Sequence, residues 1–375
     1  MLVNFIDLAA QYRELESDIN SRIQAVMSHR KFIMGPEVLE FEAALSKFGN
    51  SEFALSCANG TDALKLPLMA WGIGPGDAVF CPSFTYCATA ESIAALGATP
   101  VFVDIDRDTY NMDSISLERA IGDILKEGKL KPRAVISVDL FGQSADYDKL
   151  APITRSHDLK LIVDSAQGFG TTLKGRHPLE WADVTTTSFY PAKPLGCYGD
   201  GGAMLTNDSE LAVLLDSMRL HGKGVDKYDN VHIGMNSRLD TMQAAILLPK
   251  LKIFSKEIQK RNVVAKRYIE GLKDHVIKVP HVLEDVVSTW AQFTIEVQNP
   301  QIFMAELLSK GIPTARYYPK PVHLQTAYKH FPTQKAGLIN TENCMAKTVS
   351  LPMSPYLDED IQNLIIDEVK LASAA

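Results

Sequence analysis

The 375-residue sequence predicts an α/β protein, in which a mainly parallel sheet covered by helices is followed by a smaller α+β domain. Between Phe53 and Asp208, short apolar and β-branched runs alternate with helical stretches. Several of these runs are apolar throughout, as strands buried on both faces of a sheet are. Beyond about residue 285 the pattern becomes shorter and mixed, which indicates the second domain.

The first 50 residues predict helices. Residues 8–31 carry apolar side chains at helical spacing, Gly35 and Pro36 break the pattern, and residues 37–48 resume it. A strand-like segment follows at residues 53–56. The runs predicted as strands after it are 77–81, 99–103, 134–138, 160–163, 184–189 and 203–206.

The last third of the chain predicts a long helical region at residues 239–272 that is broken or kinked at Pro249. A strand-like segment at 290–297 and a helix near 300–310 come after it. We therefore expect a large domain at residues 1–250 and a smaller α+β domain at residues 251–375, joined by the long helix.

Composition excludes several classes of function. The net charge is −7, from 38 Lys and Arg against 45 Asp and Glu, which argues against nucleic acid or an anionic membrane as the main partner. No apolar run approaches the roughly 18 residues of a membrane span, and the N-terminus lacks a signal-peptide pattern. The five cysteines form no C-x-x-C pair, so we expect reduced thiols, no metal site and a cytoplasmic protein.

The most informative segment surrounds Lys193, which follows a predicted buried strand and precedes a glycine-dense turn. Most lysines are ordinary surface residues, but Phe189, Tyr190 and Leu195 would exclude water from this one. Loss of water lowers the pKa of a lysine toward that of a nucleophilic amine. Such an amine can form a Schiff base with a carbonyl compound or with pyridoxal phosphate.

A pyridoxal phosphate site also needs a carboxylate near the pyridine nitrogen, phosphate donors and an aromatic face. Asp164 ends a predicted strand and Gln167 follows three residues later, although the two could equally be a helix cap and its capping-box partner. Tyr86 follows another predicted strand and could stack on the ring, but core packing is the more common role of such a residue.

Phosphate donors are available where a helix is predicted to begin. Gly60 and Thr61 follow the strand-like segment, and their backbone amides with the Thr61 hydroxyl would form a phosphate cradle. Alone, this motif more often marks a simple helix start. Ser188 could be a second donor. The combination favours a pyridoxal phosphate site, because each candidate follows a strand or begins a helix.

These segments resemble the DegT/DnrJ/StrS-type sugar aminotransferases, which are fold-type-I pyridoxal phosphate enzymes related to aspartate aminotransferase. The resemblance covers nearly the whole chain and implies a large domain with a mainly parallel, seven-stranded sheet. Its most specific part is Pro-Leu-Gly-Cys-Tyr-Gly-Asp-Gly-Gly, directly after Lys193. That segment is most similar to the branch that aminates C3 of a UDP-linked 3-oxo-N-acetylglucosaminuronic acid.

The resemblance implies a role for each candidate around the cofactor ring. Lys193 would be the Schiff-base lysine and the base that transfers protons. Asp164 would pair with the pyridine nitrogen, Gln167 would contact the ring hydroxyl and Tyr86 would stack on the ring. Glutamate would be the amino donor in a ping-pong reaction that serves nucleotide-sugar and cell-surface polysaccharide synthesis, such as that of O-antigen.

The resemblance also implies which residues bind the cofactor phosphate, which residue contacts a partner subunit and which residues contact the substrate. Phosphate ligands would be Gly60, Thr61 and Ser188. Asn236 would reach the phosphate of the cofactor in a partner subunit, so the resemblance implies a homodimer. Arg238 would position the amino donor or the sugar carboxylate, and Tyr317 with Tyr318 would line the sugar pocket.

The sequence departs from the family pattern at two positions, and one proline is unexpected. Ser165 stands where the family usually has alanine, and Tyr317 where histidine is common. Pro67 lies inside a predicted helix, where it costs about 3 kcal/mol unless the helix kinks.

The sequence is also compatible with other functions. They are amination at C4 of the sugar, sugar dehydration on the same fold, and a binding or regulatory protein without turnover. A nicotinamide dehydrogenase is a poor alternative, since Gly72, Gly74 and Gly76 lie between a helix and a strand, the reverse of the dinucleotide-binding order.

Overall fold

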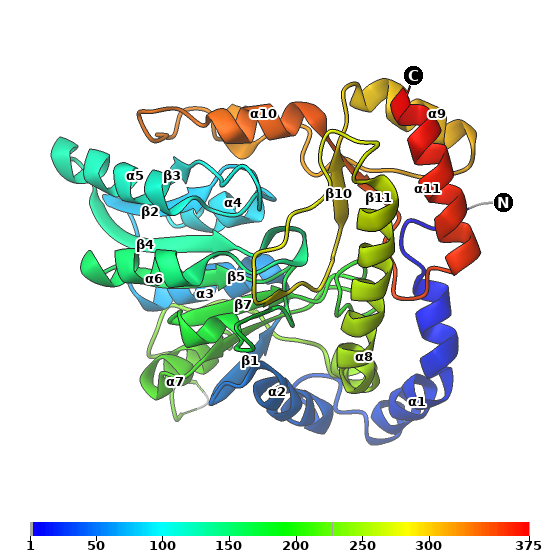
Figure 1. Ribbon diagram of the computed structural model, residues 1–375. Helices are drawn as coiled ribbons and strands as arrows, with labels where there is room; N and C mark the ends of the chain where they lie inside the picture. The colour runs from blue at the N-terminus through cyan, green and yellow to red at the C-terminus, as the bar shows by residue number, and fades with distance from the viewer. Residues whose placement is uncertain (1–2, 227, 375) are drawn as a thin grey trace.

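A seven-stranded sheet forms the centre of the computed structural model, which describes residues 3–226 and 228–374 (Figure 1). From one edge to the other the strands are β1 (Phe53–Cys57), β8 (Gly202–Thr206), β7 (Val184–Ser188), β5 (Lys160–Asp164), β4 (Lys131–Val138), β2 (Asp77–Pro82) and β3 (Thr99–Val103). Only β8 runs antiparallel to its neighbours, and the other pairs are parallel. The predicted mainly parallel α/β fold is confirmed.

Helices cover both faces of this sheet, which explains why its strands are apolar throughout. The covering helices are α3 (Gly60–Ala70), α4 (Ala88–Ala94), α5 (Ser114–Glu127), α6 (Tyr147–Ser156) and α7 (Ser209–Met218). Along β2, Phe80 packs into the cluster formed with α5 and α6, whereas Val79 packs into the cluster formed with α3 and α4. Because both faces of the sheet are buried, polar side chains that contact water or a ligand are placed at the ends of the strands.

Two N-terminal helices, α1 (Leu8–His29) and α2 (Pro36–Gly49), pack against the long helix α8 (Thr241–Leu272). Gly35 separates them, and its N–H donates to Thr241 Oγ1 at 2.9 Å. A side chain at Gly35 would lie 2.4 Å from the Lys31 carbonyl oxygen, so only glycine fits at this point. In Figure 1, α8 stands between the sheet on one side and helices α1 and α11 on the other.

Three of the described helices, α3, α6 and α8, are continuous although each contains an internal proline. Of the two alternatives expected at Pro249, the break is wrong, since α8 runs unbroken from Thr241 to Leu272, and the kink stays a prediction. Pro249 and its neighbours on both sides are buried, and this packing offsets the cost of the lost backbone hydrogen bond. Pro67 lies likewise inside α3 and is buried there.

The C-terminal part builds a second, two-stranded antiparallel sheet from β10 (Phe293–Glu296) and β11 (Thr348–Leu351). Helices α9 (Pro300–Ser309), α10 (Ile339–Lys347) and α11 (Glu359–Ala374) accompany it. A third pairing joins β6 (Thr172–Leu173) to β9 (Val286–Val287). The expected boundary between residues 250 and 251 falls inside α8, and it stays a prediction.

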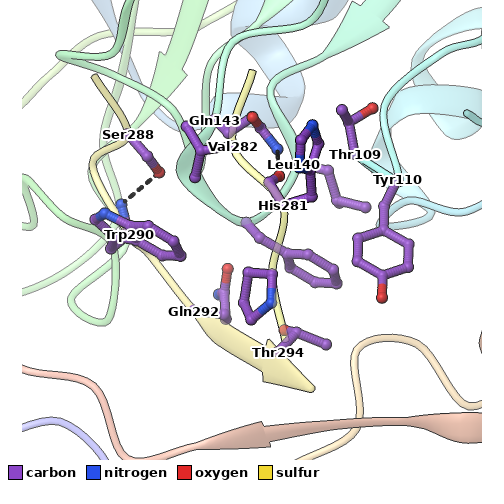
Figure 2. A pocket seen from close by; sticks show the side chains of 12 residues that line it. Thr109, Tyr110, Leu140, Gln143, His281, Val282, Ser288, Trp290, Gln292 and Thr294 are labelled. Atoms are coloured by element: carbon purple, nitrogen blue, oxygen red, sulfur yellow. Dashed lines mark hydrogen bonds between the residues drawn. The ribbon is translucent and has the colours of Figure 1, made fainter. Parts of the chain in front are cut away.

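A small cavity of about 20 Å³ lies where the segment before β10 meets the turn after β4 (Figure 2). Tyr110 and Leu140 line it from one part of the chain, and His281, Trp290 and Gln292 from the other. This volume is close to that of a single water molecule. The cavity is therefore too small for a substrate.

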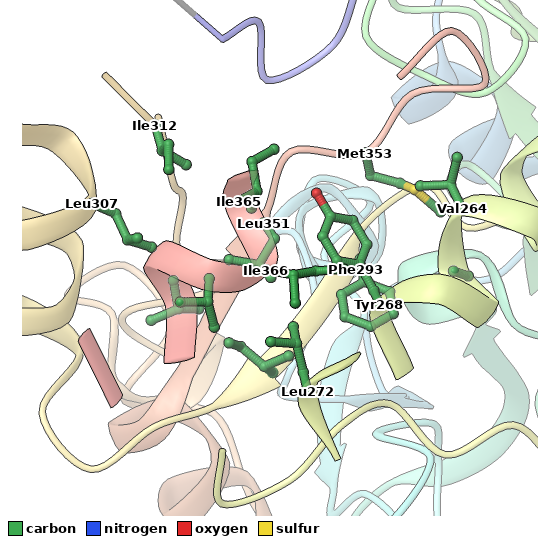
Figure 3. Close-up of a cluster of buried hydrophobic side chains, with 14 of the residues drawn as sticks. Val264, Tyr268, Leu272, Phe293, Leu307, Ile312, Leu351, Met353, Ile365 and Ile366 are labelled. Atoms are coloured by element: carbon green, nitrogen blue, oxygen red, sulfur yellow. The ribbon is translucent and has the colours of Figure 1, made fainter. Parts of the chain in front are cut away.

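The C-terminal part has an apolar core of its own (Figure 3). Tyr268 and Leu272, from the second half of α8, pack there with Phe293 and Leu351 from the two strands. Ile365 closes the cluster from α11. The two halves of α8 therefore contribute to different cores, and the helix joins them. Within the described residues, none of the helices is both long and apolar enough to cross a membrane.

An ion pair between the half-exposed Arg107 and the buried Glu296 fastens the small sheet to the large one. The side chain of Glu296 is fully buried at the end of β10, and both its oxygens accept hydrogen bonds from Arg107, which follows β3; Nη2 and Oε2 are 2.7 Å apart. Tyr110 Oη donates to Glu296 Oε1 at 2.8 Å. Since a buried carboxylate is costly without partners, these donors decide the stability of the junction.

Replacing Arg107 with methionine should lower the free energy of unfolding by about 3 kcal/mol, because Glu296 then stays buried without its cation. Equilibrium unfolding in urea measures this change. The matched control is Lys149→Met, which removes an exposed ion pair with Asp146 and should cost less than about 1 kcal/mol. Equal losses for both variants would contradict the assigned role of Glu296.

Candidate active site

Polar side chains collect at the carboxyl ends of three neighbouring parallel strands. Asp139 directly follows β4, Asp164 is the last residue of β5 and Ser188 is the last residue of β7. Val138 of β4 is paired with Asp164, so the two acidic residues lie at the same level of the sheet. This edge is where ligands bind in open α/β sheets.

Lys193 and Asp164 are brought together at this edge. Burial lowers the pKa of the Lys193 amine, and the charge of Asp164 opposes that shift. Burial likewise raises the pKa of Asp164, while Ala166 N–H, the charge of Lys193 and the Thr89 hydroxyl act in the other direction. Among the described residues, Lys193 Nζ forms no hydrogen bond or ion pair, so a desolvated amine is left for chemistry.

Asp164 is held by two donors. Ala166 N–H donates to Oδ1 and Thr89 Oγ1 donates to Oδ2, each at 3.1 Å. The Asp164 side chain therefore has a fixed orientation beside Lys193. The helix-cap alternative for Asp164 is wrong, because no helix begins after β5 and the chain continues in a turn.

Gln167 links the site to a tyrosine. Its Oε1 accepts the Phe141 N–H at 2.7 Å, and its Nε2 donates to the Tyr318 hydroxyl at 2.9 Å. An amide nitrogen carries two hydrogens, so one remains for a ligand such as a ring hydroxyl. Tyr318, whose pKa burial raises, lies 5.8 Å from the ring of Tyr317 between ring centres.

Tyr86 is 57% exposed, so the core-packing alternative for this residue is wrong. Its ring centre lies 6.3 Å from that of Tyr318, at an interplanar angle of 38°. An exposed aromatic face beside a polar edge is suited to stacking on a flat ligand.

The start of α3 packs directly on the end of β7. A side-chain carbon at Gly60 would lie 2.7 Å from Ser188 Cβ, so glycine is required for this contact. Asn59 caps the helix, with Oδ1 accepting the Asp62 N–H at 2.8 Å. The segment is thus a true helix start, and the same packing sets Thr61 and the Ser188 hydroxyl beside the helix N-terminus, which attracts phosphate.

Asn236 and Arg238 line an open cavity of about 430 Å³. The residue between them, Ser237, accepts the Ala58 N–H at 3.1 Å and donates to Asp62 Oδ2 at 2.7 Å. These two bonds attach the segment to the beginning of α3. The other residues of the cavity wall are Ala58, Gly199, Asp200, Asp240 and Gln243.

The sequence analysis missed Asp139, which is completely buried. Its carboxylate accepts hydrogen bonds from Ser165 Oγ, from Tyr147 Oη at 2.6 Å and from Ala145 N–H at 3.1 Å. Its own N–H donates to the Asp164 carbonyl at 3.0 Å. Asp139 therefore fixes the segment that carries Asp164 and Gln167. The sequence did contain a pattern that could have identified Asp139, because this residue follows an apolar run in the same way as Asp164 does.

Thr89 was missed as well, and nothing in its local sequence pointed to Asp164. Within the described residues, no group of three or more His, Cys, Asp or Glu side chains could hold a metal ion.

Asp139 should make stability depend on pH. Burial raises the pKa of its carboxyl from 3.8 to about 7, despite the hydroxyls of Ser165 and Tyr147. A pKa that is higher in the folded state contributes stability below 3.8, and this contribution is lost as the pH rises through about 7. Relative to Asp139→Asn, the wild type should therefore lose about 3 kcal/mol of unfolding free energy between about pH 5 and pH 8.

Urea unfolding of both proteins across this pH range measures the difference, and groups that titrate equally in both cancel. Tyr147→Phe serves as the companion variant, since it removes one donor to Asp139 without removing the carboxyl. A difference between wild type and Asp139→Asn that does not change with pH would contradict this assignment.

Comparison with known proteins identifies a family and several proteins that the chain resembles over most of its length. The model of the DegT/DnrJ/EryC1/StrS aminotransferase family matches residues 13–370. UDP-2-acetamido-2-deoxy-3-oxo-D-glucuronate aminotransferase of Pseudomonas aeruginosa is 45% identical over 357 residues, 95% of this chain and 96% of the relative. A protein of Geobacillus stearothermophilus named pleiotropic regulatory protein is 37% identical, over 98% of each chain.

Solved structures agree with these relatives. The crystal structure of a DegT DnrJ EryC1 StrS aminotransferase from Brucella abortus superposes with a TM-score of 0.98 at 50% identity and covers all of both chains. The pyridoxal phosphate form of the sugar aminotransferase Spr1654 from Streptococcus pneumoniae has a TM-score of 0.87 at 26% identity, over 96% of each chain.

Proposed function

Since the chain belongs to the DegT/DnrJ/EryC1/StrS aminotransferase family, we propose that it transfers an amino group from L-glutamate to C3 of a UDP-linked 3-oxo-N-acetylglucosaminuronic acid. The chain is a pyridoxal-phosphate-dependent sugar aminotransferase. To this activity the proposal adds the amino donor, the sugar substrate and the carbon atom that is aminated. The observation that carries it is the desolvated Lys193 amine beside Asp164, in a chain 45% identical to an aminotransferase named for that sugar.

The residues at the sheet edge fit the cofactor. Gly60, Thr61 and Ser188 would bind its phosphate, because the close contact between Gly60 and Ser188 sets the Ser188 hydroxyl beside the N-terminus of α3, where backbone N–H groups attract an anion. Tyr86 offers an exposed face for the ring, and Gln167 has a free N–H for the ring hydroxyl. When bound, the cofactor supplies an electron sink for a carbanion.

Lys193 and Asp164 divide the chemistry between them. The Lys193 amine, which burial shifts toward its neutral form, takes the proton from Cα of glutamate and later delivers a proton to C3 of the sugar. The carboxylate of Asp164 would hold the pyridine nitrogen of the bound cofactor and favour its protonated form. Thr89 and Ala166 hold that carboxylate in place throughout.

The substrates would bind in the open cavity and beside Tyr317 and Tyr318. Arg238 lines the 430 Å³ cavity and supplies a cation for the carboxylate of glutamate or of the uronic acid. Tyr317 and Tyr318 would border the sugar. Pairing of Tyr318 with Gln167 supports this placement, since it fixes the tyrosine hydroxyl next to the cofactor site.

We further propose a homodimer in which Asn236 reaches the phosphate of the partner's cofactor. Asn236 is exposed at the mouth of the cavity. Val225 and Ile233, which precede Asn236 in the chain, are 108% and 86% exposed, and apolar side chains so exposed favour contact with a second copy. The enzyme would act in the cytoplasm, in nucleotide-sugar synthesis for cell-surface polysaccharide such as O-antigen.

Two alternatives compete with this function. One is amination at C4 or dehydration of a related sugar nucleotide. The other is a regulatory protein without turnover, in line with the name of the Geobacillus relative. The presence of Lys193 with Asp164, Gln167 and Ser188 argues against loss of turnover.

Visible absorption of the purified protein with pyridoxal phosphate tests the proposal. We expect a cofactor band that bleaches with glutamate and returns with the 3-oxo UDP-sugar, because the two half-reactions are separate. The 4-oxo UDP-sugar is the matched control and should restore little of the band. Bleaching by glutamate with recovery only by the 4-oxo sugar would contradict the proposed position, and absence of any band would contradict the catalytic function.

Substitutions at the two central residues should have different effects. Lys193→Ala should abolish turnover, since it removes the amine that holds the cofactor and transfers protons. Asp164→Asn should lower kcat by several orders of magnitude while cofactor still binds. Steady-state kinetics and cofactor titration separate these effects, with the exposed Lys129→Ala as control. Retained transamination by Lys193→Ala would refute its role.

A further inference from the structure

Lys250 is a lysine with 0% exposure in the middle of α8, and the mechanism does not use it. Its Nζ donates to the Gly196 carbonyl oxygen at 2.7 Å and lies 4.1 Å from the centre of the Tyr198 ring. Within the described part of the chain it forms no ion pair with a carboxylate. A buried ammonium group is costly, so these two contacts are what compensate for its burial.

The carbonyl that Lys250 holds belongs to the turn that carries Lys193. Gly196 follows Lys193 by three residues, and the turn is closed by two backbone bonds of 2.8 Å, from Lys193 N–H to the Tyr190 oxygen and from Cys197 N–H to the Phe189 oxygen. A side chain at Gly196 would lie 2.6 Å from the Pro191 oxygen. The turn is therefore compact, and moving Gly196 would move Lys193 as well.

A second contact joins the same turn to the same helix. Gln243, two helical turns before Lys250, accepts the Tyr198 N–H on Oε1 at 2.9 Å. The helix thus holds the turn at Gly196 and at Tyr198. Since α8 spans both apolar cores, it is a rigid support for the loop.

Few titratable groups surround the ammonium group of Lys250. The groups that face its ammonium are Cys197 and Tyr198 from the turn and Glu257 from its own helix. Burial lowers the pKa of Lys250 to about 8, against the charges of Glu257 and Cys197. Burial lowers the pKa of Lys193, and the charge of Asp164 opposes this shift. The contact through which Lys250 acts on the Lys193 turn is its hydrogen bond to the Gly196 carbonyl, which fixes where the turn lies.

We infer that Lys250 is a positioning residue for the aminotransferase reaction: by holding the Gly196 carbonyl on α8, it keeps the Lys193 amine directed at the site beside Asp164. This inference rests on the proposed role of Lys193. Its geometric basis is the 2.7 Å bond and the closed turn, and it requires no direct contact between Lys250 and substrate or cofactor.

Stopped-flow absorption with pyridoxal phosphate measures how fast the protein captures its cofactor, before any amino donor is added. Lys250→Met keeps the apolar stem and removes the donor, and Lys252→Met is the exposed control on the same helix. We expect capture and the glutamate half-reaction to slow by at least about ten-fold in Lys250→Met, with a smaller change in KM for glutamate. The pH profile of capture should also shift, because a displaced Lys193 amine changes its surroundings.

Lys250→Arg keeps a cation and N–H donors and should restore part of the capture rate. If Lys250→Met does not fold, Lys250→Leu replaces it, since leucine is also apolar and has no side-chain donor for the Gly196 carbonyl. Capture rate, pH profile and kcat equal to those of wild type in the folded variant would overturn the inference. If the wild type captures no cofactor, it is the proposed function that fails; if it captures cofactor without aminating the sugar, the capture rates still decide the role of Lys250.

Discussion

The site depends on keeping Lys193 and Asp164 away from water and next to each other. Water would restore the amine to its protonated form and weaken the action of the carboxylate on a bound ring. Burial raises the pKa of Asp164 and lowers that of Lys193, so it favours the neutral form of each group. The charge of each group partly opposes the shift of the other. Maintaining such a pair costs stability, so the surrounding structure has to fix both partners.

The parallel sheet supplies one of these supports. Because both faces are covered by helices, polar groups collect at the strand ends, and three neighbouring strands deliver Asp139, Asp164 and Ser188 there. Asp139 then holds the segment after Asp164 through Ser165. Helix α8 supplies the other support by holding the turn after Lys193. The two partners are thus fixed from opposite sides, by elements far apart in the sequence.

Local patterns in the sequence were sufficient to predict most of the sheet and the residues that approach the cofactor. The apolar runs fall on β2, β3, β5, β7 and β8 to within about a residue, and β4 begins at Lys131, before the predicted run. Lys193 was recognisable from its apolar neighbours and the glycines after it. These features depend on residues within a few positions, which is why the sequence shows them.

Supports that depend on distant contacts could not be predicted in the same way. Lys250 lies 54 positions from Gly196, and Thr89 lies 75 positions from Asp164. On a long helix, Lys250 resembles any surface lysine until the fold covers it. The continuity of α8 through Pro249 was missed for the same reason, since packing on both sides, which no local pattern records, compensates for the proline.

The most direct test is to identify the amine that captures the cofactor. Reduction of the protein with borohydride in the presence of pyridoxal phosphate fixes the cofactor to that amine, and mass spectrometry of the peptides locates it. Burial lowers the pKa of both Lys193 and Lys250, so the label distinguishes a reactive amine from one that only supports the turn. The account predicts label on Lys193 alone. Label on Lys250, or on a surface lysine with Lys193 unmodified, would contradict it.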